Sequence, residues 1–520
     1  MKRNILVLII FFITLMAIFL LAFSISPTKD INGTAINKTQ KPVILITVDS
    51  LMSLPLQKGI QEGKAPAFSF LINNGQFHPE VISSYPTMSV TIDSTLLTGT
   101  YADQHKIPGL IWFKEDENHI ISYGSGLREI WSLGVKNVAL DSIVHLNEEH
   151  LSKSVQTIHE KLTNDNIQSA SINGLLYRGN FHHQLNVPKL ISTMGLLPND
   201  IKISGPTLLS LGALSLYNPE NDFHKLAWSR MGVNNQFTVN ELKFLIEQNK
   251  LPAFTLAYLP DGDKDLHKNG PNDLRSIEKA DQHLQELLNS YSTWEEAIEQ
   301  TIWIVHGDSA QSTVMKDKNN SLIDLNDLLK DYTFWERKNT NGEIAIAINE
   351  RMAYINLNDE NVELSEVVKI LRKDQRIGII AWKEGETNYV ISPQSNKELI
   401  FSPEGSYKDM YGQSWKLKGD HSILNLSIES GGHIEYGDYP DGLARLYGAL
   451  HSHEGRFIIV DAKPQYEFIE KHSHDHAGGG AHGSLHKIDS LVPLIITGTQ
   501  EKPEYNRLVD FKEWIIKLMK

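Results

Sequence analysis

Val43-Ile44-Leu45-Ile46-Thr47-Val48-Asp49 is a run of aliphatic and β-branched residues that ends in a carboxylate. Such a run is typical of a strand buried on both faces of a parallel sheet. Phe254 to Leu259 and Thr301 to Val305 have the same form, and aspartates follow each of them within a few residues. Because ligands bind at the carboxyl ends of strands in open α/β sheets, the three runs predict one acidic site at that edge.

Helical patterns alternate with these strands. Pro66 to Asn74 begins with proline and stops at Gly75, as helices commonly do. Asp273 to Tyr291 carries its apolar residues on one stripe, which is typical of an amphipathic helix that covers a sheet. The alternation predicts an α/β fold with a mostly parallel sheet between two layers of helices.

The periodicity changes between about Thr313 and Tyr439. Alternating isoleucines at 344, 346 and 348, and a Glu384-Gly385 turn between two short apolar runs, predict antiparallel strands. A helix over 442–450 and strands over 456–461 and 491–496 then resume the α/β pattern. The predicted organisation is a core from 42–312, an inserted α+β lobe over 313–439, and the second part of the core over 440–520.

The N-terminus carries nineteen uncharged residues, Ile5 to Phe23, preceded by Lys2 and Arg3. This length spans a hydrocarbon core, and the basic flank is expected on the cytoplasmic side. Residues 1–25 are therefore predicted to be a transmembrane anchor, with 26–41 as a linker and the rest of the chain outside the cytoplasm. A cleaved signal, which would make the protein secreted, is the alternative, although Ser24-Ile25-Ser26 is a poor cleavage site.

Composition narrows the classes of function. The net charge is -14, and lysines and arginines are scattered, so no nucleic-acid binding is expected. The absence of cysteine excludes thiolate metal ligands and a thiol nucleophile. An acidic protein that acts on an anionic phosphate needs a local positive charge, which divalent cations bound by histidines and carboxylates would supply.

One serine is a candidate nucleophile. The segment from Tyr85 to Tyr101 reads as a loop that enters a helix closed by Gly99, and it places Ser89 at the N-terminus of that helix. The positive end of a helix dipole favours an alkoxide and a bound phosphate there. Alternatively, Ser89 is only an N-cap. Thr87 is a second candidate for the nucleophile.

Two segments offer metal ligands. Asp263 and His267 lie four residues apart in a predicted loop, flanked by Asp261 and Asp265, and such oxygen and nitrogen donors suit divalent ions. The glycine-rich stretch His472 to His486 holds five histidines, and it reads either as metal-binding or as a flexible polar loop.

Together these motifs, in this order along the chain, resemble the alkaline phosphatase superfamily, and within it the type I phosphodiesterase/nucleotide pyrophosphatase family. The resemblance implies a three-layer alkaline phosphatase-like sandwich with a mostly parallel central sheet and two divalent metal ions, zinc or manganese. The roles it implies are Ser89 as nucleophile, Asp263, His267 and His482 as ligands of one ion, and Asp49, Asp308 and Ser89 as ligands of the other.

One departure from the family pattern concerns the second ion. The family reads Asp-His-Gly where this chain reads Asp308-Ser309-Ala310, so one imidazole ligand is missing. The second ion then either binds weakly or is a harder ion that prefers oxygen ligands. Otherwise it is coordinated by His306 or by a histidine of the glycine-rich stretch, or it is absent.

The function implied is hydrolysis of a phosphodiester or nucleotide pyrophosphate in a small molecule or lipid headgroup. The alternatives are a phosphoglycerol or phosphoethanolamine transferase, and a catalytically impaired member that binds a ligand.

Overall fold

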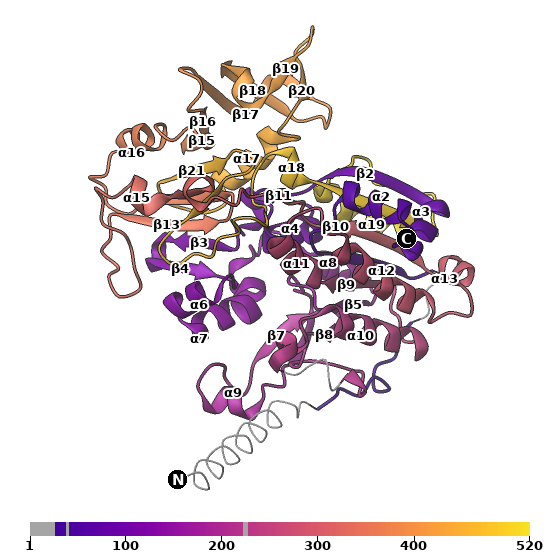
Figure 1. Cartoon of the computed structure of the whole chain (residues 1–520). Helices are drawn as coiled ribbons and strands as arrows, with labels where there is room; N and C mark the ends of the chain where they lie inside the picture. The colour runs from indigo at the N-terminus through magenta and orange to yellow at the C-terminus, as the bar shows by residue number, and fades with distance from the viewer. Residues whose placement is uncertain (1–26, 38–40, 222–226, 520) are drawn as a thin grey trace, which may run out of the picture.

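The computed structural model describes residues 27–37, 41–221 and 227–519 (Figure 1). Within these residues the central sheet has seven strands, in the order β2 (Gly75–Ile82), β24 (Leu491–Thr497), β10 (Ile302–Gly307), β1 (Val43–Val48), β9 (Phe254–Leu259), β5 (Ser169–Ile172) and β8 (Leu208–Ser210). The strands from β10 to β8 are parallel to one another, and β24 is antiparallel to both of its neighbours. The predicted, mostly parallel sheet is confirmed.

Alternate residues of β1 point into two separate cores. Val43 and Leu45 pack against α4 (Ser89–Thr98), α8 (Ile158–Asn164) and α19 (Phe511–Leu518). Ile44 and Ile46 pack against helices of the opposite layer, which are α2 (Ser53–Gln61), α3 (Pro66–Asn73), α10 (Asn235–Glu247) and α12 (Leu274–Leu288). The strand is apolar throughout because both of its faces are covered, and the three-layer sandwich follows.

A second sheet forms the inserted lobe, which lies at the top and left of Figure 1. Among the described residues it has nine strands: β13 (Ile344–Asn349), β14 (Met352–Leu357), β21 (Phe457–Ala462), β15 (Ile377–Glu384), β16 (Thr387–Ile391), β17 (Glu398–Asp409), β18 (Ser414–Gly419), β20 (His433–Tyr436) and β19 (Leu426–Ile428). Helices α16 (Leu364–Leu371) and α17 (Gly442–Leu450) pack on its two faces.

The lobe also takes a strand from the segment that the sequence pattern places in the core. β21 pairs with β14 and β15 in the second sheet, and it does not enter the central one. An apolar run predicts a buried strand, but it carries no information on which of two sheets the strand joins. The chain therefore leaves the lobe only after β21.

No helix in 27–37, 41–221 or 227–519 is long and apolar enough to cross a membrane. The anchor predicted over Ile5 to Phe23 lies outside the described residues. The prediction of a membrane-anchored or secreted protein with its catalytic domain outside the cytoplasm is therefore corrected, because the described residues do not show membrane anchoring.

A buried ion pair joins the lobe to the core. Arg351, in the turn between β13 and β14, and Asp489, in α18 (Lys487–Ser490), both have fully buried side chains and contact each other directly. The guanidinium also donates to the carbonyl oxygens of Ala462 and Tyr466, at 3.1 and 3.2 Å. Removing the cation would leave a buried carboxylate without its counter-charge.

We expect Arg351→Met to destabilise the protein by about 3–5 kcal/mol, because breaking a buried ion pair leaves one charge buried without its partner. Lys369→Met is the matched control, since Lys369 and Glu366 form an exposed pair that contributes about 0–1 kcal/mol. Urea denaturation of both variants measures the difference. Equal midpoints for the two would contradict the assigned role.

Candidate functional site

Strand register brings the predicted aspartates to one edge of the central sheet. Val48, the last residue of β1, pairs with Leu259 of β9 and Gly307 of β10. Asp49 and Asp308 are the next residues of their strands, and Asp263 follows β9 in the helix α11 (Asp261–Asn269). The acidic edge predicted from the three apolar runs is present in the structure.

Ser50 connects two of these carboxylates. Its backbone N–H donates to Asp308 Oδ1 at 2.9 Å, and its hydroxyl donates to Asp263 Oδ1 at 2.9 Å. The residue adopts a left-handed φ of 58°, which turns the chain sharply after β1. Gln311 Nε2 donates to the same Asp263 oxygen at 2.7 Å.

The segment that carries Asp263 and His267 is a helix, where the sequence pattern predicts a loop. Residues four apart on a helix share a face, and His267 Nε2 lies 3.0 Å from Asp263 Oδ1. The flanking Asp261 and Asp265 turn elsewhere, since Asp261 accepts a hydrogen bond from Asn235 N and Asp265 pairs with Lys279. The helical spacing thus selects Asp263 from the three aspartates.

His482 reaches the same point from the glycine-rich segment. Its Nε2 lies 3.4 Å from Asp263 Oδ1, and its Nδ1 is hydrogen-bonded to the carbonyl oxygen of Thr87. The next residue, Gly483, has a φ of +105°, and a Cβ there would lie 2.2 Å from the Asn349 carbonyl oxygen, so glycine is needed for this approach. One potential ligand atom from each of Asp263, His267 and His482 lies within 4.8 Å of the others.

The two candidate nucleophiles have different surroundings. Met88 occupies the N-cap of α4, and Ser89 is the first helical residue, half-buried, so the structure does not use Ser89 as the N-cap. Thr87 is fully buried, and its hydroxyl oxygen accepts a hydrogen bond from Gly483 N at 2.6 Å. Thr87 thereby ties the loop before α4 to the loop that carries His482.

Two further polar residues, which were not among the predicted ligands, lie beside the His267 imidazole. Glu350, in the β13–β14 turn of the lobe, places Oε1 3.5 Å from His267 Nε2 and 3.7 Å from His482 Nε2. The ring of His476 stacks on that of His267 with centroids 4.1 Å apart. The histidine-rich composition indicates His476, whereas nothing in the local sequence singles out a glutamate in a turn of the insert.

Asp93 and Tyr258 extend the acidic cluster inward. Asp93 lies one turn after Ser89 on the same face of α4, and burial, together with the nearby Asp308 carboxylate, raises its pKa to about 8. The Tyr258 hydroxyl donates to Asp49 Oδ2 at 2.5 Å. The spacing of four residues between Ser89 and Asp93 is the signal that could have found Asp93.

The arrangement fits bound cations at two points. Asp49 Oδ1 and Asp308 Oδ2 are buried with no hydrogen-bond partner, and a buried unpaired carboxylate oxygen is costly unless a cation binds it. Burial, and then the carboxylates of Asp308 and Asp263, raise the pKa of Asp49 well above its ordinary value. The oxygen and imidazole donors of Asp263, His267 and His482 are those preferred by zinc.

The position of the missing imidazole holds a small buried hydroxyl. Ser309 Oγ lies 3.3 Å from Ser50 Oγ, and its backbone N–H donates to Asp308 Oδ1 at 2.7 Å. His306 contacts Thr47 Oγ1 through Nε2 at 2.9 Å and the Gly307 carbonyl through Nδ1, and its ring packs on Phe511. Both ring nitrogens of His306 are thus engaged by other groups.

Comparison with known proteins identifies the class. The family model described as type I phosphodiesterase/nucleotide pyrophosphatase matches residues 43–485. No curated protein matches the chain. Among solved structures, murine ectonucleotide pyrophosphatase/phosphodiesterase 5 is similar, with a TM-score of 0.55, 13% identity, and 92% of this chain and 95% of that chain covered.

Two further solved structures show the same likeness. An inactive variant of the murine protein in complex with AMP also has a TM-score of 0.55 and 13% identity, with the same shares of both chains covered. The human ectonucleotide pyrophosphatase/phosphodiesterase 5 has a TM-score of 0.55 and 15% identity, and the alignment covers 92% of this chain and 95% of that chain. These identities show a shared fold.

The chain belongs to the type I phosphodiesterase/nucleotide pyrophosphatase family, because the match covers most of its length. It is therefore a phosphoric ester hydrolase of the alkaline phosphatase superfamily. The family is metal-dependent, typically with two ions, and acts on small-molecule phosphate esters such as nucleotides.

We expect Thr87→Val to destabilise the protein by about 1–3 kcal/mol, because the buried Gly483 N–H loses its acceptor. Thr87→Ser keeps the hydroxyl and serves as the control, with a smaller loss. Urea denaturation compares the three proteins. A valine variant as stable as the serine variant would show that this hydrogen bond does not hold the two loops together.

Proposed function

We propose that the protein hydrolyses phosphodiester or nucleotide pyrophosphate bonds by nucleophilic attack of Ser89 at a two-metal site. The observation that carries the proposal is the convergence of Asp49, Asp263 and Asp308 at the edge of the sheet, with two carboxylate oxygens left without a partner. Family membership supports the reaction class.

The ligands would divide into two sets. Asp263, His267 and His482 would hold a zinc ion, and Glu350 lies close enough to the two imidazoles to contribute an oxygen. Asp49, Asp308 and Ser89 would hold the other ion. Since Ser309 replaces the imidazole, the second set has only oxygen donors, which suits a harder ion such as Mg²⁺ or Mn²⁺.

Charge balance supports a cation between the first three ligands. Burial opposes the charged form of His482, but the Glu350 and Asp263 carboxylates outweigh it and raise its pKa to about 9. The same carboxylates hold the pKa of His267 well above its ordinary value despite burial. The carboxylates thus require nearby positive charge, which a divalent ion would provide while releasing the imidazole protons.

Ser89 is placed to act as the nucleophile. As the first residue of the ten-residue helix α4, it lies where free backbone N–H groups and the helix dipole favour negative charge. Its Oγ would attack phosphorus, form a phosphoserine ester and expel the leaving-group oxygen, and water would then release a phosphomonoester and restore the hydroxyl. Bound divalent ions would supply Lewis-acid stabilisation of the phosphoryl oxygens.

Ser89→Ala is expected to lower turnover of an aryl phosphodiester such as bis(4-nitrophenyl) phosphate by about a thousandfold or more, because the attacking oxygen is lost. Ser89→Thr keeps a hydroxyl and should retain measurable turnover, and Thr87→Ser should resemble the wild type. Release of 4-nitrophenol measures all of them. Full activity of Ser89→Ala would refute the role of this serine.

The two sets of ligands should respond differently to substitution. Asp263→Asn is expected to lose the one zinc ion assigned to Asp263, His267 and His482, and Asp308→Asn is expected to lose Mg²⁺ or Mn²⁺ while retaining that zinc ion. Metal content after dialysis, measured by inductively coupled plasma mass spectrometry, separates the two outcomes. Chelation of the wild type should abolish turnover, and adding zinc together with manganese should restore it. Turnover that survives complete chelation would refute metal dependence.

A further inference from the structure

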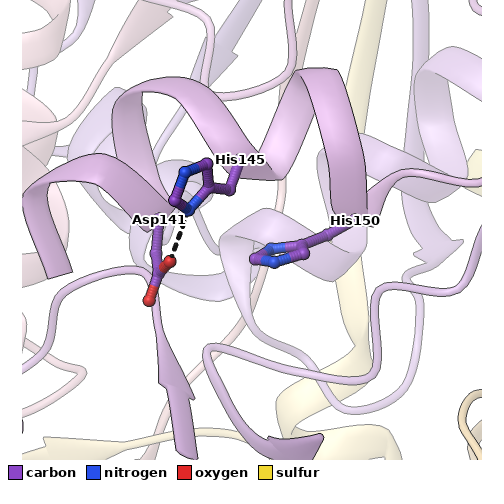
Figure 2. Close-up of side chains that lie close together, drawn as sticks. All are labelled: Asp141, His145 and His150. Carbon is purple, nitrogen blue, oxygen red and sulfur yellow. Dashed lines mark hydrogen bonds and ion pairs between the residues drawn. The ribbon is translucent and has the colours of Figure 1, made fainter. Parts of the chain in front are cut away.

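A second group of metal-ligating side chains lies away from the candidate site. Asp141, His145 and His150 belong to one helical segment, η2 (Asp141–His150), and one potential ligand atom from each lies within 4.8 Å of the others. Figure 2 shows the three side chains turned toward one another, with His145 and Asp141 in contact and the His150 ring facing them. The acidic edge that holds Asp49 and Asp308 uses none of these residues.

The backbone conformation is what brings the three residues to one face. In an α-helix, residues nine apart are about two and a half turns apart and point in opposite directions. Asp141–His150 is a π-helix, whose hydrogen bonds join residues five apart, as Leu151 N to Leu146 O does at 3.0 Å. In this wider helix nine residues make about two turns, so His150 returns to the face of Asp141 and His145.

Long π-helical segments are rare, and single π-turns inside α-helices are frequently found at functional sites. Here the unusual winding has one specific geometric result, which is the alignment of two imidazoles and a carboxylate. An α-helix of the same sequence would keep the Asp141–His145 pair, four residues apart, and would turn His150 away. The conformation therefore distinguishes a three-ligand site from a simple ion pair.

The donors suit a borderline divalent cation. Asp141 Oδ1 and His145 Nδ1 are 2.9 Å apart, and two atoms bound at about 2.0–2.1 Å to one tetrahedral zinc ion lie about 3.3 Å apart. The His145 side chain is 30% exposed, which leaves a path from solvent.

Partners around His150 fix its orientation. Its Nδ1 lies 2.9 Å from the Tyr123 hydroxyl, which also accepts a hydrogen bond from Trp112 Nε1 at 3.2 Å. The tautomer in which Nδ1–H donates to Tyr123 leaves Nε2 unprotonated and available to a metal. Histidines that bind metals commonly donate their other ring N–H to such a partner. The ring also packs edge-on against Trp112, with centroids 5.7 Å apart.

We propose that Asp141, His145 and His150 form a second metal site, which binds one zinc ion and is separate from the catalytic centre. Glu149 Oε1 lies 3.8 Å from His145 Nε2, the ring nitrogen that does not face Asp141, so water completes the coordination. Zinc displaces the proton that His145 shares with Asp141, and this proton passes to solvent.

The site would brace a segment that contacts the neighbourhood of Ser89. Asn147, on the same π-helix, donates to the Leu175 carbonyl at 3.1 Å and accepts from the Tyr177 N–H at 2.7 Å. The backbone N–H groups of Leu175 and Leu176 are hydrogen-bonded to Asp93 of α4. Zinc on η2 thus stabilises the loop that holds the Asp93 carboxylate.

The test is a zinc count on the full-length protein after metal removal and dialysis against zinc chloride. His145→Ala/His150→Ala is expected to bind one equivalent less than the wild type, and His150→Phe, which keeps the ring packing on Trp112, should lose the same equivalent. His182→Ala/His433→Ala is the control, since it removes two exposed histidines and should match the wild type.

A second arm separates this site from the catalytic one. In the Asp263→Asn background the wild-type η2 segment should still bind one zinc, and zinc should still raise the Tm. Adding His145→Ala/His150→Ala should abolish both effects. Unchanged zinc content in both the His145→Ala/His150→Ala and the His150→Phe proteins would overturn the proposal, and it would leave the proposed function of Ser89 untouched.

Discussion

The crowding of three aspartates at the end of a buried parallel sheet is the constraint on which the rest of the structure depends. Asp49 and Asp308 extend neighbouring strands that are in register, and Asp263 follows the third on α11. Like charges in a buried place repel one another, so the fold must compensate them. Hydrogen bonds from Ser50 and Tyr258, together with the two imidazoles, compensate part of this charge. Two of the carboxylate oxygens still have no hydrogen-bond partner. A phosphohydrolase that binds cations is the function that such an unbalanced edge suits.

The inserted lobe takes part in this site. Its β13–β14 turn supplies Glu350 to the imidazoles, and the next residue, Arg351, forms the buried pair with Asp489. Arg351 N also donates to the His482 carbonyl at 2.9 Å, which holds the glycine-rich segment in place. The lobe therefore positions one of the imidazoles at the acidic edge. A rearrangement of the lobe would move His482 and so change its contact with Asp263.

The type of helix determines which residues at a given sequence spacing lie on the same face. Four residues separate Asp263 from His267, and in α11 this spacing brings both to one face. Nine residues separate Asp141 from His150, and only the π-helical winding of η2 brings them together. The first juxtaposition follows from an ordinary helix once the segment is known to be helical, whereas the second depends on a conformation with no simple sequence signal.

The sequence by itself determined the buried strands, their acidic ends, the helix that begins at Ser89 and the order of motifs, because apolar periodicity and terminal residues act locally. From these the fold class was predictable, and the family resemblance that rests on the order of the motifs implied the meeting of Asp263, His267 and His482. Only the tertiary structure decided that β21 joins the lobe, that Glu350 reaches the imidazoles and that Thr87 binds Gly483. These contacts join residues more than 80 positions apart in the chain, the nearest pair being His267 and Glu350, and long-range packing sets them, so a local pattern cannot encode the partner.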